Sequence, residues 1–256
     1  MGICNICNTN LEYDLKDSLT FDEILAFREG LVCKKCGSIS RDRMMMWVLA
    51  NTNSKTSNLS DIPENKNLRI LESTATRGHT NVLDLKFEYL NTIFDSDAIK
   101  AGKDPKKFAD FQNLHYDDSY FDYILASDVF EHVRLDDDAY SEIFRTLKTG
   151  GYFLMTVPFS YELDKTMIRV KPEGDKDIFL LPPEYHADHT LVYRIYGRDL
   201  FDKLTQHGFH VCYLHAQIKK YGISKQEVFI CRKGNYVDTD FLDNKDVLIF
   251  KKENYF

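Results

Sequence analysis

The 256-residue sequence lacks the apolar segments expected of a membrane-spanning or secreted protein. It contains no run of roughly eighteen apolar residues, so no segment is predicted to cross a bilayer as a helix. The first residues, M-G-I-C-N-I-C-N, include neither a basic stretch nor an apolar stretch and do not resemble a signal peptide. We therefore expect a cytoplasmic protein with no membrane partner.

A block of basic residues is also missing. The chain has 33 Lys and Arg residues against 40 Asp and Glu residues, a formal net charge of −7. Because nucleic-acid binding depends on neutralising phosphates, a nucleic-acid partner is not expected. The length and the 43% hydrophobic content allow one large domain with a small appendage. Neither feature predicts an oligomeric state.

Four of the six cysteines lie in the first forty residues, as two C-x2-C pairs. Cys4, Cys7, Cys33 and Cys36 supply the four thiolates that a tetrahedral zinc site requires. Each pair is followed by a residue that tolerates positive φ, Asn8 or Gly37, as the turn around the metal needs. Two disulfides are the alternative, and the absence of a secretion signal argues against them. We predict a structural zinc ion, since four thiolates leave no open position.

The segment Asp110–Phe159 contains a strand, a helix and a second strand. Phe121–Ala126 is a short apolar run typical of a buried strand. Asp136–Lys148 has apolar residues at helical spacing and is expected to stop at Gly150-Gly151. Tyr152–Val157 is the second strand, so the two strands should be parallel.

These residues also resemble a known family. The segments F-D-Y-I, S-D-V-F-E-H-V, L-K-T-G-G-Y-F and V-P-F occur in the order found in Rossmann-like S-adenosylmethionine-dependent methyltransferases. Thr149 stands where that family usually has proline. The resemblance implies an α/β fold with a seven-stranded, mostly parallel sheet.

A narrower resemblance covers nearly the whole chain. C-K-K-C-G-S-I-S-R-D-R at 33–43 and D-H-T-L-V-Y-R-I-Y-G at 188–197 are similar to segments of a bacterial family in which a zinc ribbon precedes the methyltransferase core. It implies a zinc ribbon at 1–40, a helix and linker at 41–67, and a methyltransferase domain at 68–256. The helix that begins at Arg41–Leu49 carries Met and Trp residues that we expect to pack the ribbon onto the core rather than to form a Met-rich binding surface.

The methyltransferase resemblance assigns residues to S-adenosylmethionine. The predicted strand Leu68–Leu71 is followed by Glu72 and then by a turn with little glycine. The predicted strand Tyr89–Phe94 is followed by Asp95, which we expect to bind the ribose hydroxyls; Asp97 is the other candidate for this role. Asp110 and Phe111 would contact adenine, and Asp128 and Val129 the methionine end. The predicted cofactor residues are Glu72, Ser73, Thr74, Gly78, Asp95, Asp110, Phe111, Asp128 and Val129. Helix capping is the alternative for the first turn and for Asp95.

Residues 159–196 form a long insertion that we expect to cover the substrate. His132, His186 and His189 are the predicted catalytic residues, with Tyr161 and Tyr193 beside the acceptor. Packing of the loop is the alternative. A metal at His186, Asp188 and His189 is not expected, because no further carboxylate or histidine of suitable spacing is near in sequence. The C-terminal part should contain a helix at Asp199–His207 and two antiparallel strands that bury Cys212 and Cys231 as free thiols.

The predicted function is methyl transfer from S-adenosylmethionine to an oxygen or nitrogen of a small molecule or glycan precursor. Two alternatives are open: a non-catalytic binding module whose cofactor site has degraded, and a methyltransferase that acts on a macromolecule recognised by the ribbon. The acidic net charge argues against RNA as that macromolecule. The acceptor itself is not predicted.

Overall fold

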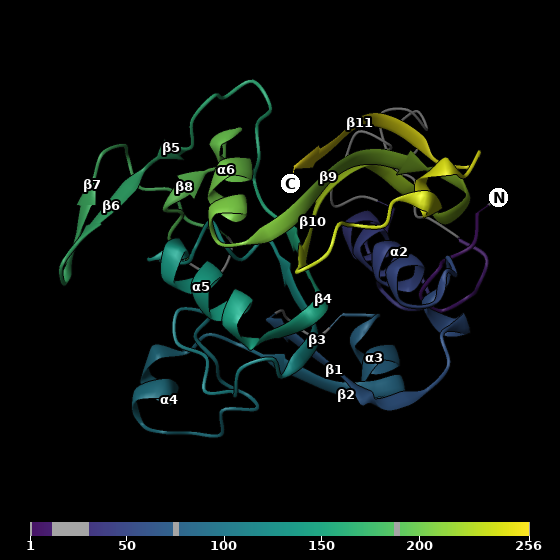
Figure 1. The fold of residues 1–256 in the computed structure, drawn as a ribbon, viewed down its shortest axis with the longest axis horizontal. Helices are drawn as coiled ribbons and strands as arrows, with labels where there is room; N and C mark the ends of the chain where they lie inside the picture. Colours follow the sequence, from purple (N-terminus) through teal and green to yellow (C-terminus); the bar gives the residue numbers. More distant parts are fainter. Residues whose placement is uncertain (1, 12–30, 74–76, 187–189, 256) are drawn as a thin grey trace.

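The computed structural model describes residues 2–11, 31–73, 77–186 and 190–255. At its centre is a seven-stranded sheet with the order β11-β9-β10-β4-β3-β1-β2 (Figure 1). Its strands are β1 (Asn65–Ser73), β2 (Phe87–Thr92), β3 (Phe121–Ser127), β4 (Leu147–Thr156), β9 (Phe209–Ile218), β10 (Ile223–Lys233) and β11 (Leu248–Tyr255). The predicted α/β fold with a seven-stranded central sheet is therefore present.

Strand direction places the functional edge of the sheet. β2, β1, β3 and β4 are parallel to one another, whereas β10 pairs antiparallel with β4 and β9, and β11 pairs antiparallel with β9. The carboxyl ends of the four parallel strands therefore meet at one edge, which is where open α/β sheets bind ligands.

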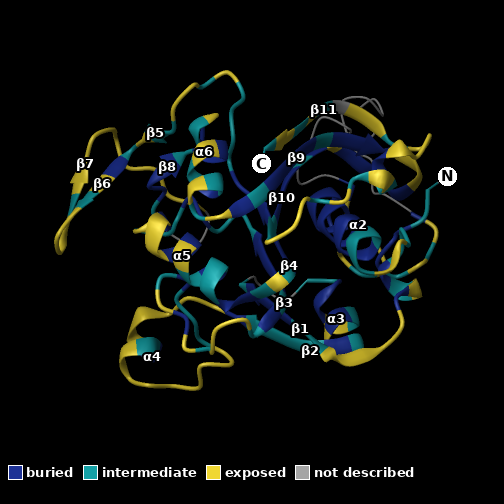
Figure 2. Cartoon of the chain, viewed as in Figure 1, coloured by how far each residue is buried: buried dark blue, intermediate teal, exposed yellow. Residues whose placement is uncertain are grey.

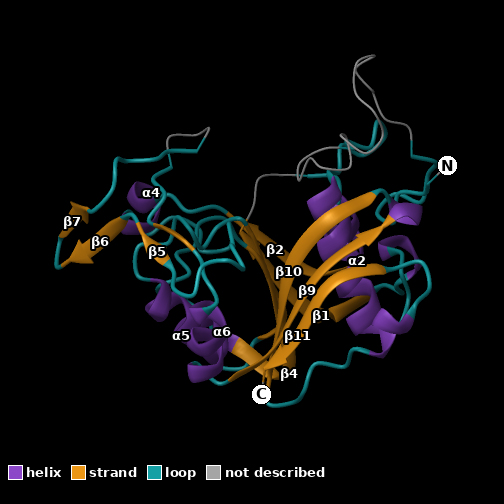
Figure 3. Ribbon diagram, turned by 90° about the horizontal axis from the view of Figure 1, so that it is seen from above, coloured by secondary structure: helices purple, strands orange, loops and turns teal. Residues whose placement is uncertain are grey.

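Helices cover both faces of the sheet (Figure 3). The helices are α2 (Ser40–Ser54), α3 (Thr80–Lys86), α4 (Ser96–Lys100), α5 (Asp136–Thr146) and α6 (Asp199–Gln206), with short 3-10 turns η1 (Leu59–Asp61), η2 (Lys219–Tyr221) and η3 (Asp240–Asp243). Alternate residues of each strand pack on opposite faces, so Ile70 contacts the cluster that includes α2 and α3, and Leu71 the cluster that includes α5 and α6. No helix in the described ranges is long and apolar enough to cross a bilayer.

Helix α2 is buried on all sides from Ser40 to Ala50 (Figure 2). Met44, Met45, Met46 and Trp47 pack in one cluster with Cys4 and Cys33 and with residues of β9 and β10. The prediction that these side chains join the cysteine segments to the core is confirmed, and the alternative of a Met-rich binding surface is wrong because the methionines are not exposed.

The expected helix stop at Gly150-Gly151 is wrong. Helix α5 ends at Thr146, and β4 begins at Leu147, so both glycines lie inside the strand. Between Phe121–Leu147 and Tyr123–Tyr152 the pairing of β3 with β4 shifts register, so the glycines belong to a bulge. Gly150 has a φ of +85°, which explains the residue type better than a helix end does.

The segment after Tyr236, to which the sequence assigns no role, ends in β11 at the edge of the sheet. This strand pairs antiparallel with β9 from Leu248–Gln217 to Tyr255–Val211. Cys212 and Cys231 are buried free thiols in β9 and β10, as predicted.

The insertion at 159–196 forms two small antiparallel sheets beside the main one. Their strands are β5 (Met167–Ile168), β6 (Val170–Glu173), β7 (Lys176–Phe179) and β8 (Arg194–Ile195). β6 and β7 make a largely exposed hairpin (Figure 2). The insertion returns along the segment that follows β3, because Tyr193 N donates to Glu131 O at 2.8 Å.

Candidate functional site

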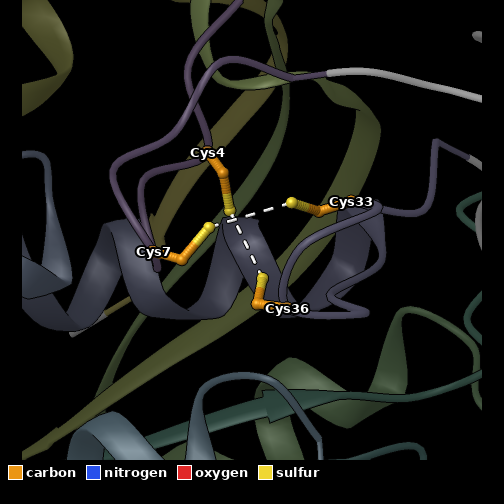
Figure 4. Close-up of side chains that lie close together, drawn as sticks. All are labelled: Cys4, Cys7, Cys33 and Cys36. Atoms are coloured by element: carbon orange, nitrogen blue, oxygen red, sulfur yellow. Dashed lines mark hydrogen bonds between the residues drawn. The ribbon is translucent and has the colours of Figure 1, made fainter.

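The four N-terminal cysteines converge, as Figure 4 shows. The Sγ atoms of Cys4 and Cys36 are 3.7 Å apart, and those of Cys7 and Cys33 are 3.8 Å apart. Tetrahedral zinc with bonds of about 2.3 Å requires sulfur separations of about 3.8 Å, so the site fits the ion. A hydrogen bond from the Cys36 thiol lowers the pKa of Cys4 to about 4, so the cluster favours a thiolate at that position.

Each cysteine pair forms the turn that its sequence predicts. Asn8 N donates to Cys4 O and Gly37 N to Cys33 O, both at 2.8 Å. Asn8 has a φ of +53° and Gly37 a φ of +72°. The turns are the local geometry that lets backbone amides face the sulfur atoms.

Gly78 lies against the second of these turns. A Cβ atom at this position would be 2.2 Å from the carbonyl oxygen of Cys36. Only glycine therefore allows this close approach between the loop after β1 and the cysteine cluster. Its predicted contact with the cofactor stays a prediction.

The two arginines of the R-D-R segment have different partners. Arg43 is fully buried and donates to four main-chain carbonyls, those of Leu31, Ser38, Tyr221 and Gly222, at 2.6 to 2.9 Å. Arg41 instead forms an ion pair with Asp128. The Arg43 side chain thus fixes the cysteine segment to η2, and the Arg41 side chain reaches the carboxyl end of β3.

Asp128 directly follows β3 and has a φ of +51°. Besides Arg41, its carboxylate accepts a hydrogen bond from Thr156 Oγ1 at 2.9 Å, and its amide donates to Thr156 O at 3.0 Å. These bonds tie the ends of β3 and β4 together. A non-glycine residue in the left-handed region at the carboxyl end of a buried strand is a recurrent feature of functional sites.

Glu72 is the last residue but one of β1 and is fully buried. Its carboxylate contacts His79 Nε2 at 3.0 Å and accepts from Tyr89 OH at 2.5 Å. Burial opposes a charge on His79, but Glu72 and Asp42 outweigh burial, so the pKa of His79 is raised. Glu72 thus connects β1 to the start of α3 and to β2.

Asp95 and Asp110 lie on the loops after β2 that lead to β3. Asp95 caps α4, since its Oδ1 accepts from the amides of Asp97 at 3.1 Å and Ala98 at 2.9 Å. The Asp110 carboxylate is bound by the amide and the side chain of Gln112. Asp95 therefore acts as a helix cap in this structure. The contacts of Asp95 with the ribose and of Asp110 with adenine stay predictions.

The other predicted cofactor residues lie in different parts of the sheet edge and the core. Phe111 is buried, with its ring 6.0 Å from that of Phe130. Ser73 ends β1, and Val129 packs at the margin of the α5–α6 cluster. Thr74 lies outside the described residues.

His132 and His186, two of the predicted catalytic residues, are in contact. His132 Nε2 and His186 Nδ1 are 3.0 Å apart, although 54 residues separate them. Glu131 Oε1 lies 3.7 Å from the first nitrogen and 3.9 Å from the second. His189 lies outside the described residues.

The two tyrosines expected beside the acceptor both have partners within the protein. Tyr161 donates a hydrogen bond to Glu253 of β11 and lies near Phe159 and Tyr213. Tyr193 donates to Asp177 Oδ2 at 2.8 Å, and burial with Asp177 raises the pKa of Tyr193 to about 12. The contact of these two residues with an acceptor stays a prediction.

Residues 71–155 match the family model described as a methyltransferase domain. The chain carries a methyltransferase domain. A sterol 24-C-methyltransferase, erg6 of Schizosaccharomyces pombe, is 37% identical over 59 residues, a match that spans 22% of this chain and only 16% of that relative. Solved methyltransferase structures from Mesorhizobium loti (TM-score 0.41, 15% identity) and Methanosarcina mazei (0.42, 14%) are also similar; each match covers 66% of this chain and 92% or 93% of the other.

The structure brings together two sets of residues whose contacts the sequence does not reveal. Arg41 reaches Asp128 from 87 positions away, and Glu131 joins His132 and His186. The S-R-D-R segment contains Arg41, and the S-D-V-F-E-H segment contains Asp128, Glu131 and His132, but only the fold shows which residues they meet.

Proposed function

We propose that the chain transfers a methyl group from S-adenosylmethionine to an oxygen or nitrogen of a small molecule or glycan precursor. The observation that carries this proposal is the methyltransferase-domain match, which spans β1 to β4. Among the proposed cofactor residues, Glu72 and Ser73 end β1, and Asp128 and Val129 follow β3; open α/β sheets bind ligands at this edge.

Asp95, Asp110 and Asp128 would hold the ribose, the adenine and the methionine part, respectively. Carboxylates suit the first two tasks because they accept hydrogen bonds from hydroxyl and amino groups. Asp128 is already positioned by Arg41 and Thr156. When bound, S-adenosylmethionine supplies an activated methyl group on a sulfonium, so the main task of the protein is to position the acceptor.

Cys4, Cys7, Cys33 and Cys36 would hold one structural zinc ion. The sulfur separations of 3.7 and 3.8 Å support this assignment. The cluster is packed against α2 and the loop at Gly78, so the ion would stabilise the domain rather than take part in the reaction.

The experiment that tests the proposal uses S-adenosylmethionine labelled in the methyl group and a panel of hydroxyl- and amine-bearing sugars, nucleotide sugars and small metabolites. We expect the label to appear in at least one acceptor class, with one S-adenosylhomocysteine formed for each methyl group transferred. Tight cofactor binding without transfer to any acceptor would instead support the binding-module alternative, which the domain match does not favour.

A further inference from the structure

We infer that Glu131, His132 and His186 form a second metal site, which binds a divalent cation in the acceptor region of the domain. The ligand atoms of the three residues lie within 4.8 Å of one another. The presence of this site is independent of the proposed function, but its role in methyl transfer rests on that function.

The spacing of the three atoms fits a single ion. His132 Nε2, His186 Nδ1 and Glu131 Oε1 are separated by 3.0, 3.7 and 3.9 Å. The circle through these atoms has a radius of about 2.1 Å, which equals a usual bond length from zinc to imidazole nitrogen or carboxylate oxygen. An ion at the centre of this circle would lie at bonding distance from all three atoms.

The tautomer of His132 is also suitable. Its Nδ1 is 2.8 Å from the main-chain oxygen of Leu191, so Nδ1 carries the proton and Nε2 presents its lone pair to the cluster. Metal-binding histidines usually donate their other ring N–H to a carbonyl or a carboxylate in this way. The backbone bond of Tyr193 N to Glu131 O holds the two segments together at the same place.

A buried arginine further fixes the position of the segment that carries the first two ligands. Arg194 donates to the carbonyls of Phe130, Val133 and Arg134 at 3.2, 2.7 and 2.9 Å. Glu131 is fully buried and His132 is mostly buried, whereas the His186 side chain is 42% exposed. The site is thus preorganised on one side and accessible on the other.

The ligand set indicates the class of ion. Two imidazoles and one carboxylate suit Zn²⁺, Fe²⁺, Mn²⁺ or Co²⁺, whereas Mg²⁺ and Ca²⁺ prefer oxygen ligands alone. Three protein ligands leave coordination positions open for a substrate, unlike the four cysteines. A cation with open positions points to an acceptor that binds through a hydroxyl oxygen.

The site would therefore direct the proposed reaction toward O-methylation. A cation lowers the pKa of a hydroxyl group that it binds, and the released proton passes to solvent. The acceptor oxygen then forms a bond to the methyl carbon while the carbon–sulfur bond breaks and its electron pair stays on sulfur. The products are a methyl ether, S-adenosylhomocysteine and one proton.

Cobalt titration of the full chain tests the site. Protein that retains zinc at the cysteines is titrated with Co²⁺ and followed by absorption. We expect weak visible bands that saturate at one cobalt per chain, without the near-ultraviolet band of a cobalt–thiolate bond. His186→Gln and His132→Gln should each weaken the site by roughly tenfold or more. His115→Gln, a change at an exposed histidine outside the cluster, should not.

Three results would overturn the inference: no saturable cobalt binding, a spectrum with thiolate bands alone, or an unchanged affinity in His186→Gln. Any of them would leave the two histidines as a hydrogen-bonded pair. Because His186 is exposed, its variant should fold even if His132→Gln does not, and thermal melting checks both. Cobalt binding without S-adenosylmethionine binding would count against the proposed function alone, and the reverse against this inference alone.

Discussion

Arg41, in the first turn of α2, forms an ion pair with Asp128 at the carboxyl end of β3. The two side chains are 5% and 17% exposed. This pair joins the segment after the cysteine cluster to the strand end where we place the methionine part of S-adenosylmethionine. Changes near the zinc site should therefore affect the cofactor site.

Arg41→Ala should lower the free energy of unfolding by about 2–4 kcal/mol, because it leaves the partly buried Asp128 carboxylate with the Thr156 hydrogen bond but without its ionic partner. It should also weaken S-adenosylmethionine binding. Urea unfolding and a binding titration measure the two effects. Arg69→Ala is the control, since Arg69 pairs with Glu88 on the surface and its loss should change stability little. Equal effects of the two changes would contradict our interpretation of the Arg41–Asp128 pair.

Gly78→Ala should destabilise the protein by about 1–3 kcal/mol, because the new Cβ atom would overlap with the carbonyl oxygen of Cys36. The melting temperature should fall and zinc should be lost more readily to a chelator. If the variant melts normally and only its affinity for S-adenosylmethionine falls, then Gly78 serves the cofactor as the sequence predicts.

Purified protein should contain one zinc ion per chain at the four cysteines. Removing it with a chelator should expose the amides of residues 2–11 and 31–40 to hydrogen exchange while the central sheet keeps its protection. Cys36→Ser should have the same effect in milder form. Zinc-free protein, or disulfides between the paired cysteines, would rule out this site.

The stability provided by His79 should depend on pH. Its pKa is raised in the folded protein above the ordinary value of 6.5, chiefly because of Glu72 and despite burial. The favourable contribution is therefore complete below pH 6.5 and disappears as the pH rises through the folded-state pKa. The unfolding free energy of wild type minus that of His79→Gln should be larger at pH 6 than at pH 9. His115→Gln should give a small difference at both values, and a larger His79 effect at pH 9 would refute the assignment.

The sequence predicts the parts of the fold that depend on local pattern. β3, α5 and β4 follow from apolar runs and helical spacing within one segment, and the cysteine turns follow from C-x2-C spacing. The prediction from Gly150-Gly151 is wrong because glycine is common both in strand bulges and at helix ends. Only the pairing of β4 with β3 shows that these two glycines belong to a bulge. β11 is not predictable in this way, since it carries three consecutive charged residues and its partners in β9 lie 31 (Leu248–Gln217) to 44 (Tyr255–Val211) positions before it.

The site shows the same division between local and long-range information. Asp128, His132 and His186 are candidates from their residue types and their places after strands. Their partners are set by tertiary structure, which brings Arg41 to Asp128 and Glu131 to both histidines. A sequence search for metal ligands near His186 fails because the other two ligands lie 54 and 55 positions before it.

The most direct test of the central claim is an isothermal titration of the purified chain with S-adenosylmethionine. We predict saturable binding of one molecule per chain, and Asp95→Ala should weaken it by about 1–3 kcal/mol, the scale of a hydrogen bond to a charged group. Asp97→Ala, a change two positions away, should leave the affinity nearly unchanged. No saturable binding by the wild-type protein would contradict the claim that this domain is an S-adenosylmethionine-dependent methyltransferase.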